Sequence, residues 1–319
     1  MVRLPRQPLG GTGLQVSRLC FGTLTMGPLQ RNLSPADGAA LLQHGFRQGI
    51  NFFDTAQIYG TYPHLRTFLK QVPRQEVVLM TKSYAWSRDT AEKAVTEALE
   101  ALDTPYLDLF LMHEQESVHT LRGHREALDH YLFLKDKGLI RGVGISTHRV
   151  AAVTASLKIP ELDLIFPIFN PKGLGIYDGT LEEMAEALIQ ARLQGKAVVG
   201  MKPLGGGHLL KSYEESLRFS LHHPLLDAVA VGMQTTTEID ANCLLAAGMP
   251  LPPEARAATM ARKRQLHIGS ECIGCGKCVA VCRQEALALH HDRAVVDHTA
   301  CILCSYCVGG CPEFAIKII

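Results

Sequence analysis

Short apolar segments alternate with longer amphipathic segments from about residue 15 to residue 247. The short segments have the length and the apolar content of buried strands. They are Arg18–Gly22, Asn51–Asp54, Val77–Lys82, Leu107–His113, Gly142–Ser146, Leu162–Phe166, Ala197–Met201 and Leu226–Val231. The longer segments, which have helical periodicity, are Pro35–Gln48, Asp89–Leu102, Arg125–Lys137, Leu181–Leu193 and Glu214–His222.

This alternation of strands and helices predicts an α/β fold, a (β/α)8 TIM barrel. The alternative is an open doubly wound sheet, which typically has a G-x-G-x-x-G turn after its first strand. No such turn follows Arg18–Gly22. We therefore expect the barrel.

The composition changes after the last predicted strand. Pro250–Pro253 interrupts the helical pattern, and Glu254–Gln265 has the polar composition of a connecting helix. We expect a barrel over residues 1–249, a linker over 250–270 and a small α+β domain over 271–319.

Net charge and hydropathy bear on the partners and the location expected for this protein. The formal net charge is +1, which gives no support for binding to nucleic acid or to an anionic membrane. The N-terminal residues lack the apolar region of a secretory signal, and no apolar stretch is long enough to span a bilayer. We expect a soluble cytoplasmic protein.

Eight of the ten cysteines lie between Cys272 and Cys311. The other two, Cys20 and Cys243, lie in apolar stretches, as expected of buried thiols. Regular C-x-x-C spacing without an export signal favours metal or cluster binding over disulfides.

The eight clustered cysteines have the spacing of a bacterial ferredoxin with two [4Fe–4S] clusters. Each run is C-x2-C-x2-C-x3-C, and Pro312 follows the second run. In that pattern the fourth cysteine of each run binds the other cluster. The predicted sets are Cys272, Cys275, Cys278 and Cys311 for one cluster, and Cys282, Cys301, Cys304 and Cys307 for the other. A pair of zinc sites would not require the third and fourth cysteine of each run.

Ionisable side chains occur at or just beyond the ends of three successive predicted strands. Asp54 and Tyr59 follow the second strand, Lys82 ends the third and His113 ends the fourth. The carboxyl ends of barrel strands meet at one rim, where the active sites of such barrels are built. We therefore expect these four residues to meet there.

The chain resembles the aldo-keto reductase family over residues 9–247. The resemblance rests on LGGTGLQVSRLCFGT, GINFFDTAQIYG, KGLIRGVGIST and VGMKPLGGG, together with the Lys82 and His113 strands and SLRFSLHHPLLDAVAVGM. It implies the barrel fold and an oxidoreductase that reduces a carbonyl or oxidises an alcohol. A C-terminal two-cluster domain follows this barrel.

The resemblance also implies roles for the four rim residues. Tyr59 is the general acid, and Lys82 lowers its pKa, because an unperturbed tyrosine is a weak acid near neutrality. Asp54 holds Lys82 charged, and His113 orients the substrate carbonyl. Tyr84 and the only tryptophan, Trp86, follow Lys82; they either line the substrate site or, for Trp86, belong to the core.

Family members bind a nicotinamide cofactor across the barrel mouth. Ser146 and Thr147 fall where the family holds the carboxamide with Ser and Asn, so half of that pair matches. Gly205, Gly206, Gly207 and Asn242 are the expected contacts for pyrophosphate and adenine. Three further positions depart from the family pattern: Phe166 replaces a glutamine, Met201 replaces an aromatic residue and Glu238 lies near the usual arginine. A carboxylate at residue 238 disfavours an adenosine 2′-phosphate, so NAD(H) is expected over NADP(H).

Nicotinamide transfers a hydride, whereas iron–sulfur clusters transfer single electrons. A flavin, which is not excluded, or a partner such as a ferredoxin or flavoprotein is needed to connect them. Three interpretations stay open. The chain is a reductase whose clusters exchange electrons with a partner, an electron-transfer or flavin-linked protein whose barrel no longer binds nicotinamide, or an ordinary carbonyl reductase with structural or oxygen-sensing clusters.

Overall fold

The computed structural model describes residues 3–261 and 263–319. A closed barrel of parallel strands occupies the larger part of the molecule. Its strands are β3 (Leu19–Gly22), β4 (Phe52–Asp54), β5 (Val78–Ser83), β6 (Leu107–Met112), β7 (Ile140–Thr147), β8 (Leu164–Pro167), β9 (Ala197–Met201) and β10 (Ala228–Gly232). Strand β10 pairs with β3 and closes the barrel, so the predicted (β/α)8 fold is confirmed.

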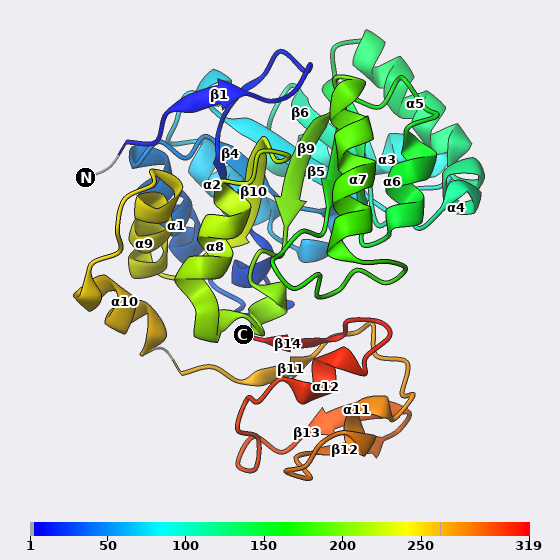
Figure 1. Ribbon diagram of the computed structural model, residues 1–319. Helices are drawn as coiled ribbons and strands as arrows, with labels where there is room; N and C mark the ends of the chain where they lie inside the picture. Colours follow the sequence, from blue (N-terminus) through cyan, green and yellow to red (C-terminus); the bar gives the residue numbers. More distant parts are fainter. Residues whose placement is uncertain (1–2, 262) are drawn as a thin grey trace.

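Helices surround the barrel (Figure 1). The predicted ones are α1 (Pro35–Arg47), α3 (Arg88–Leu102), α5 (Arg125–Asp136), α7 (Leu181–Leu193) and α8 (Tyr213–Leu221). The sequence pattern did not indicate α2 (Tyr62–Leu69), α4 (Val118–Gly123), α6 (Val150–Ser156) or α9 (Thr236–Ala246). Helix α9 lacks an amphipathic pattern because it packs against α1, α8 and α10 (Pro253–Met260).

A hairpin of β1 (Arg6–Pro8) and β2 (Gln15–Ser17) precedes the barrel. Its turn lies against the start of β9, where the Gly11 amide donates to the Gly195 carbonyl at 3.0 Å. The hairpin therefore covers the amino ends of the strands and leaves the carboxyl ends free for a site. Among the described residues, no helix is long and apolar enough to cross a membrane.

The C-terminal part forms a small α+β domain. Strand β11 (Leu266–Ile268) pairs antiparallel with β14 (Ile316–Ile318), and β12 (Leu287–His290) pairs with β13 (Arg293–Val296). Two short helices, α11 (Lys277–Ala280) and α12 (Tyr306–Gly309), pack against each other. Strand β11 falls within residues 250–270, which the sequence indicated as a linker.

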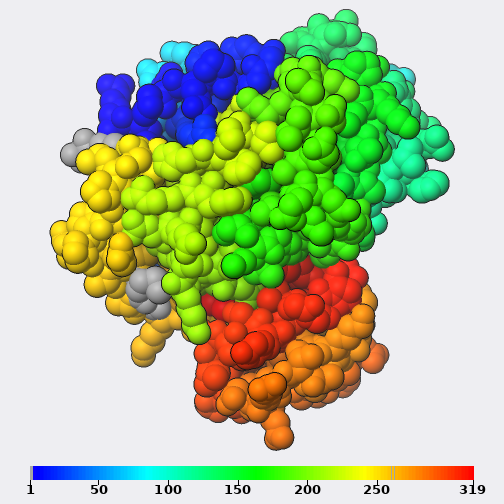
Figure 2. Space-filling model, in the orientation of Figure 1, coloured from blue at the N-terminus to red at the C-terminus, as the bar shows by residue number. Residues whose placement is uncertain are grey.

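The small domain docks on the barrel rim (Figures 1 and 2). The Tyr177 hydroxyl, in the loop after β8, donates to the Glu313 carbonyl at 2.9 Å. His208 Nε2, in the loop after β9, is 2.9 Å from the Ile316 carbonyl. Strand β14 thus lies across the loops that follow the carboxyl ends of β8 and β9.

Gly207 is the tightest point of this docking. Its φ is +93°, and an added Cβ would lie 2.2 Å from the Ile318 carbonyl oxygen. We expect Gly207→Ala to cost on the order of 1–3 kcal/mol in docking, from steric conflict and backbone strain. Thermal unfolding and limited proteolysis of residues 264–319 measure this effect.

Gly138→Ala is the matched control, because Gly138 has a φ of +76° but no atom within 4 Å of an added Cβ. This variant should lower stability without exposing the C-terminal domain to protease. Equal protease resistance of both variants would show that the Gly207 contact does not hold the domain in place.

Candidate active site

The four rim residues predicted from the sequence lie at the carboxyl ends of adjacent strands. Asp54 ends β4, Lys82 lies near the end of β5 and His113 directly follows β6. Tyr59 lies in the short 3-10 helix η2 (Gln57–Tyr59), which follows β4. Parallel pairing of β4 with β5 and of β5 with β6 brings these ends together.

Their side chains form a chain of contacts. Lys82 Nζ donates to Asp54 Oδ1 at 2.5 Å and to the Thr55 carbonyl at 2.7 Å. The same nitrogen lies 4.9 Å from the centre of the Tyr59 ring. The Tyr59 and His113 rings meet edge to face, with centroids 5.9 Å apart. Tyr59 is therefore flanked by the Lys82–Asp54 ion pair and by His113.

The direction of the Tyr59 pKa corrects one expectation. Burial raises the pKa of Tyr59 well above its ordinary value, and the negative charges of Asp54 and Glu114 raise it further. The Lys82 cation does not reverse this rise in the Tyr59 pKa, because Asp54 Oδ1, 2.5 Å from Lys82 Nζ, offsets its charge. Tyr59 therefore stays protonated through neutral pH, which is the form that donates a proton.

His113 is buried and neutral. Burial, and then the charges of Lys82 and Lys202, lower the pKa of His113 well below its ordinary value. Its ring stacks on Tyr84 at 4.4 Å, and its Nδ1 has no hydrogen-bond partner among the described residues. A bound ligand can form a hydrogen bond with this nitrogen. Trp86 is 60% exposed, so it is not a core residue.

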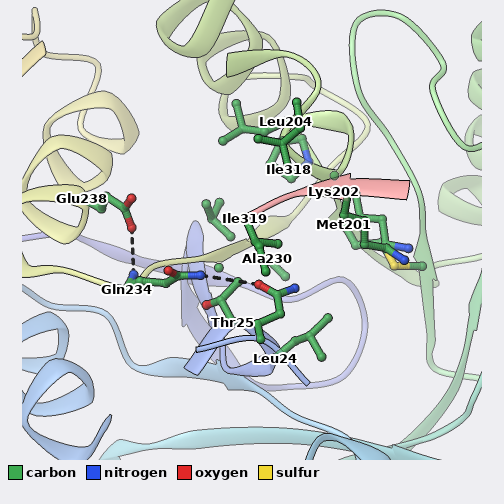
Figure 3. Close-up of a pocket in the computed structure, with 18 of the residues that line it drawn as sticks. Leu24, Thr25, Met201, Lys202, Leu204, Ala230, Gln234, Glu238, Ile318 and Ile319 are labelled. Atoms are coloured by element: carbon green, nitrogen blue, oxygen red, sulfur yellow. Dashed lines mark hydrogen bonds between the residues drawn. The ribbon is translucent and has the colours of Figure 1, made fainter. Parts of the chain in front are cut away.

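A long cleft begins at Asp54 and Tyr59 and extends over the barrel mouth to Glu238 and Asn242 on α9. It contains about 1130 Å³ of space that is partly open to solvent. The C-terminal residues Ile318 and Ile319 also line it, and Figure 3 shows both side chains beside the barrel residues of the cleft. The small domain therefore contributes a wall of the cleft.

The three departures named above, Phe166, Met201 and Glu238, all line this cleft. Phe166 replaces the expected amide, and its ring centre is 5.1 Å from Lys82 Nζ, so the ring supports the cation. Met201 lines the same cleft. Ser146 and Thr147 do not line it. Their hydroxyls are engaged within the protein: Ser146 Oγ accepts from the Glu114 backbone amide, and Thr147 Oγ1 donates to the Gln115 carbonyl.

Only some of the remaining residues predicted to contact the nucleotide line the cleft. Gly206, Gly207 and Asn242 line the cleft, whereas Gly205 does not. Asn242 Oδ1 accepts a hydrogen bond from the Tyr213 hydroxyl. Gly206 and Gly207 also leave room for the docked domain, since an added Cβ on Gly206 would lie 3.3 Å from Phe314.

Sequence reasoning missed the cation next to Glu238. The Glu238 carboxylate accepts a hydrogen bond from the backbone amide of Gln234 at 2.8 Å (Figure 3). It also lies 3.7 Å from the Arg264 guanidinium. Arg264 lines the cleft but comes from the segment that joins the barrel to the small domain. The only sequence signal was the basic run ARKRQ before the cysteines.

The eight clustered cysteines line two separate small cavities. One is lined by Cys272, Cys275, Cys278 and Cys311, and the other by Cys282, Cys301, Cys304 and Cys307. The Ala294 amide points to Cys272 Sγ at 3.4 Å, and the Ala315 amide points to Cys311 Sγ at 3.3 Å. Thiols around a cavity, with backbone amides directed at two of the sulfurs, fit an iron–sulfur cluster.

Comparison with known families agrees with this geometry. Residues 18–243, which make up most of the chain, match the model of the aldo/keto reductase family. The chain belongs to the aldo-keto reductase family. Residues 264–312 match a 4Fe-4S dicluster domain. The predicted ferredoxin-like domain is thus confirmed, and this aldo-keto reductase carries a domain for iron–sulfur clusters.

Two curated relatives of this aldo-keto reductase are a dehydrogenase and a reductase. It is 26% identical over 283 residues to L-galactose dehydrogenase of Arabidopsis thaliana, covering 76% of this chain and 88% of the relative. It is 27% identical to 6-dehydroglucose reductase of Novosphingobium aromaticivorans, covering 72% and 79% of the two chains. The chain is therefore an oxidoreductase, as predicted.

A solved aldo-keto reductase from Bacillus halodurans, in its holo form, has the same fold. The TM-score is 0.65 at 24% identity, and the match covers 81% of this chain and 96% of the other. At this level of identity the likeness shows the fold alone.

Proposed function

We propose that this chain reduces a small carbonyl compound, or oxidises the corresponding alcohol, with Tyr59 as the general acid or base. The observation that supports it is the contact chain from Asp54 through Lys82 to Tyr59 and His113 at one end of the cleft. Tyr59 donates its hydroxyl proton to the carbonyl oxygen. Lys82, although paired with Asp54, lies 4.9 Å from the Tyr59 ring centre and is the group proposed to stabilise the charge left on Tyr59. Neutral His113 orients the carbonyl.

The cleft fits an elongated ligand that reaches from Tyr59 to Asn242, as a nicotinamide dinucleotide does. When bound, this cofactor supplies the hydride. Gly206, Gly207 and Asn242 are the proposed contacts along the cleft. Ser146 and Thr147, which occupy the family's carboxamide positions, engage their hydroxyls within the protein. Arg264, 3.7 Å from Glu238, offsets part of the carboxylate charge. NAD(H) is proposed over NADP(H) because the Glu238 carboxylate disfavours a 2′-phosphate and can accept a hydrogen bond from a 2′-hydroxyl.

Anaerobic titration of the cluster-loaded protein with NADH and NADPH tests nucleotide use. NADH is expected to bind at least about tenfold more tightly than NADPH, which corresponds to about 1.4 kcal/mol. Glu238→Gln should reduce this ratio, because it removes the charge that repels the 2′-phosphate. Absence of binding by either nucleotide would contradict the proposal of a nicotinamide site.

The two sets of four cysteines are proposed to hold the two clusters, which supply single-electron transfer when bound. A ferredoxin or a flavoprotein is the proposed source or acceptor of these electrons. The same titration, followed by visible absorbance, tests this part. Loss of cluster absorbance on addition of NADH supports electron exchange between the halves, whereas carbonyl turnover without that loss supports structural or oxygen-sensing clusters.

A second candidate function has one observation in its favour. Ile318 and Ile319 lie in the cleft, where they compete for space with a dinucleotide. In this candidate the barrel no longer binds nicotinamide, and the chain is an electron-transfer or flavin-linked protein. Binding of neither nucleotide in the titration, with the clusters intact, would favour it.

A further inference from the structure

Lys202 is a half-buried lysine that lines the cleft described above. It directly follows β9, and its φ of +55° is unusual for a residue with a side chain. Lys202 Nζ lies 2.7 Å from His148 Nε2 and 5.3 Å from the centre of the Phe314 ring. Among residues 3–261 and 263–319, no carboxylate lies within ion-pair distance of Lys202 Nζ. A strained backbone that places a lysine in a cleft, with no carboxylate at ion-pair distance among the described residues, indicates a binding role.

A second lysine reaches the same cleft from the other domain. Lys317, on β14, lines the cleft together with Lys202, and its side chain is only 12% exposed. Its Nζ lies 3.2 Å from Glu271 Oε1. An added Cβ on Gly206 would lie 3.5 Å from Lys317 Cγ, so the missing side chain leaves room for the lysine stem.

The two cations affect each other and the groups around them. Burial, and next the positive charge of Lys317, lower the pKa of Lys202 to about 8. Lys202 in turn lowers the pKa values of His113 and His148. Glu114 and Glu271 act in the opposite direction on the Lys202 pKa, and Asp54 is paired with Lys82. Because neither glutamate is at ion-pair distance from Lys202 Nζ, its ammonium keeps room for an anionic group of a bound ligand.

The geometry points to a substrate that carries a carboxylate or phosphate group near its carbonyl, with Lys202 and Lys317 binding that group while Tyr59 acts on the carbonyl oxygen. The inference rests on the function proposed for Tyr59. Lys202, Lys317 and Tyr59 line the same cleft, which is the geometric basis of the inference. The substrate site is thus shared between the barrel and the cluster domain.

The inference is tested by isothermal titration calorimetry on the cluster-loaded full chain. The probes are two matched pairs, pyruvate with methyl pyruvate and glyceraldehyde 3-phosphate with glyceraldehyde. We expect the anionic member of at least one pair to bind about tenfold or more tightly than its neutral partner, because a charge-assisted hydrogen bond is lost with the anion. The pair that shows this ratio identifies the group as carboxylate or phosphate.

Lys202→Met and Lys317→Gln should each abolish this preference without weakening the neutral probe, and Lys317→Arg should restore it. Lys211→Gln removes an exposed lysine of the nearby rim and should change nothing. Tyr59→Phe should keep the binding preference, so failure of the catalytic role and failure of the anion site are distinguishable. An unchanged visible spectrum shows that each variant keeps its clusters.

Three results would overturn the inference. One is equal binding of the anionic and neutral members in both pairs. Another is a preference that survives in both Lys202→Met and Lys317→Gln. The third is loss of NADH affinity in these variants with the preference intact, which would assign the two lysines to the phosphates of a dinucleotide instead.

Discussion

Tyr59→Phe is expected to reduce carbonyl turnover by about 10²–10⁴-fold, the usual contribution of a positioned general acid. The variant keeps the aromatic ring that packs against His113 and beside Lys82 but loses the proton that is donated to the carbonyl oxygen. Because burial raises the pKa of Tyr59, the native hydroxyl stays protonated through neutral pH. Reduction should therefore not lose its acid until the pH is alkaline, whereas alcohol oxidation should increase as the pH rises. Steady-state turnover across pH measures both effects.

Tyr62→Phe is the control for this experiment. Tyr62 is a buried tyrosine close to Tyr59 in the sequence, and its hydroxyl lies 2.9 Å from Thr81 Oγ1. Its loss removes a structural hydrogen bond worth about 1 kcal/mol and should leave turnover unchanged. Turnover of Tyr59→Phe within about twofold of the native rate would show that the acid is another group, since a general acid contributes far more. The cluster spectrum should be the same in all three proteins.

Removal of two cysteines from the same cavity is expected to eliminate one cluster, whereas removal of one from each cavity is expected to eliminate both. Cys272 and Cys311 line one cavity, and Cys282 lines the other. The double variant of Cys272→Ala with Cys311→Ala should keep about half of the native iron, because the second set of four thiolates is complete. The double variant of Cys272→Ala with Cys282→Ala should keep almost none. Iron and sulfide analysis with electron paramagnetic resonance measures this.

The opposite result would assign each run of four cysteines to its own cluster. In that arrangement, Cys272→Ala with Cys282→Ala would keep about half of the iron and the pair with Cys311→Ala would lose nearly all. Cys243→Ala is the control, because Cys243 is a buried thiol of α9 in the barrel domain. It should keep both clusters, and any loss of iron there would reflect general instability.

The barrel and its rim residues could be predicted because their signals are local. A buried strand in a closed parallel barrel is a short apolar run, and an ionisable residue at its end stands out from that run. Asp54, Lys82 and His113 were found in this way, and parallel register then brings them to one rim. Helix α9 was missed for the converse reason: its neighbours cover it on several sides, so it has no polar face to set a period.

The sequence pattern predicts the barrel strands, the four ionisable residues at their ends and a two-cluster domain. It does not predict that β14 lies on the barrel mouth, where Lys317 and Ile319 enter the cleft from about three hundred residues beyond the first strand. Only the tertiary structure shows this position of β14, and it also shows that Arg264 lies beside Glu238 and that Ser146 and Thr147 engage their hydroxyls inside the protein. The physical reason is that periodicity reports which face of an element is buried, whereas docking of one domain on another depends on contacts between residues far apart in the chain.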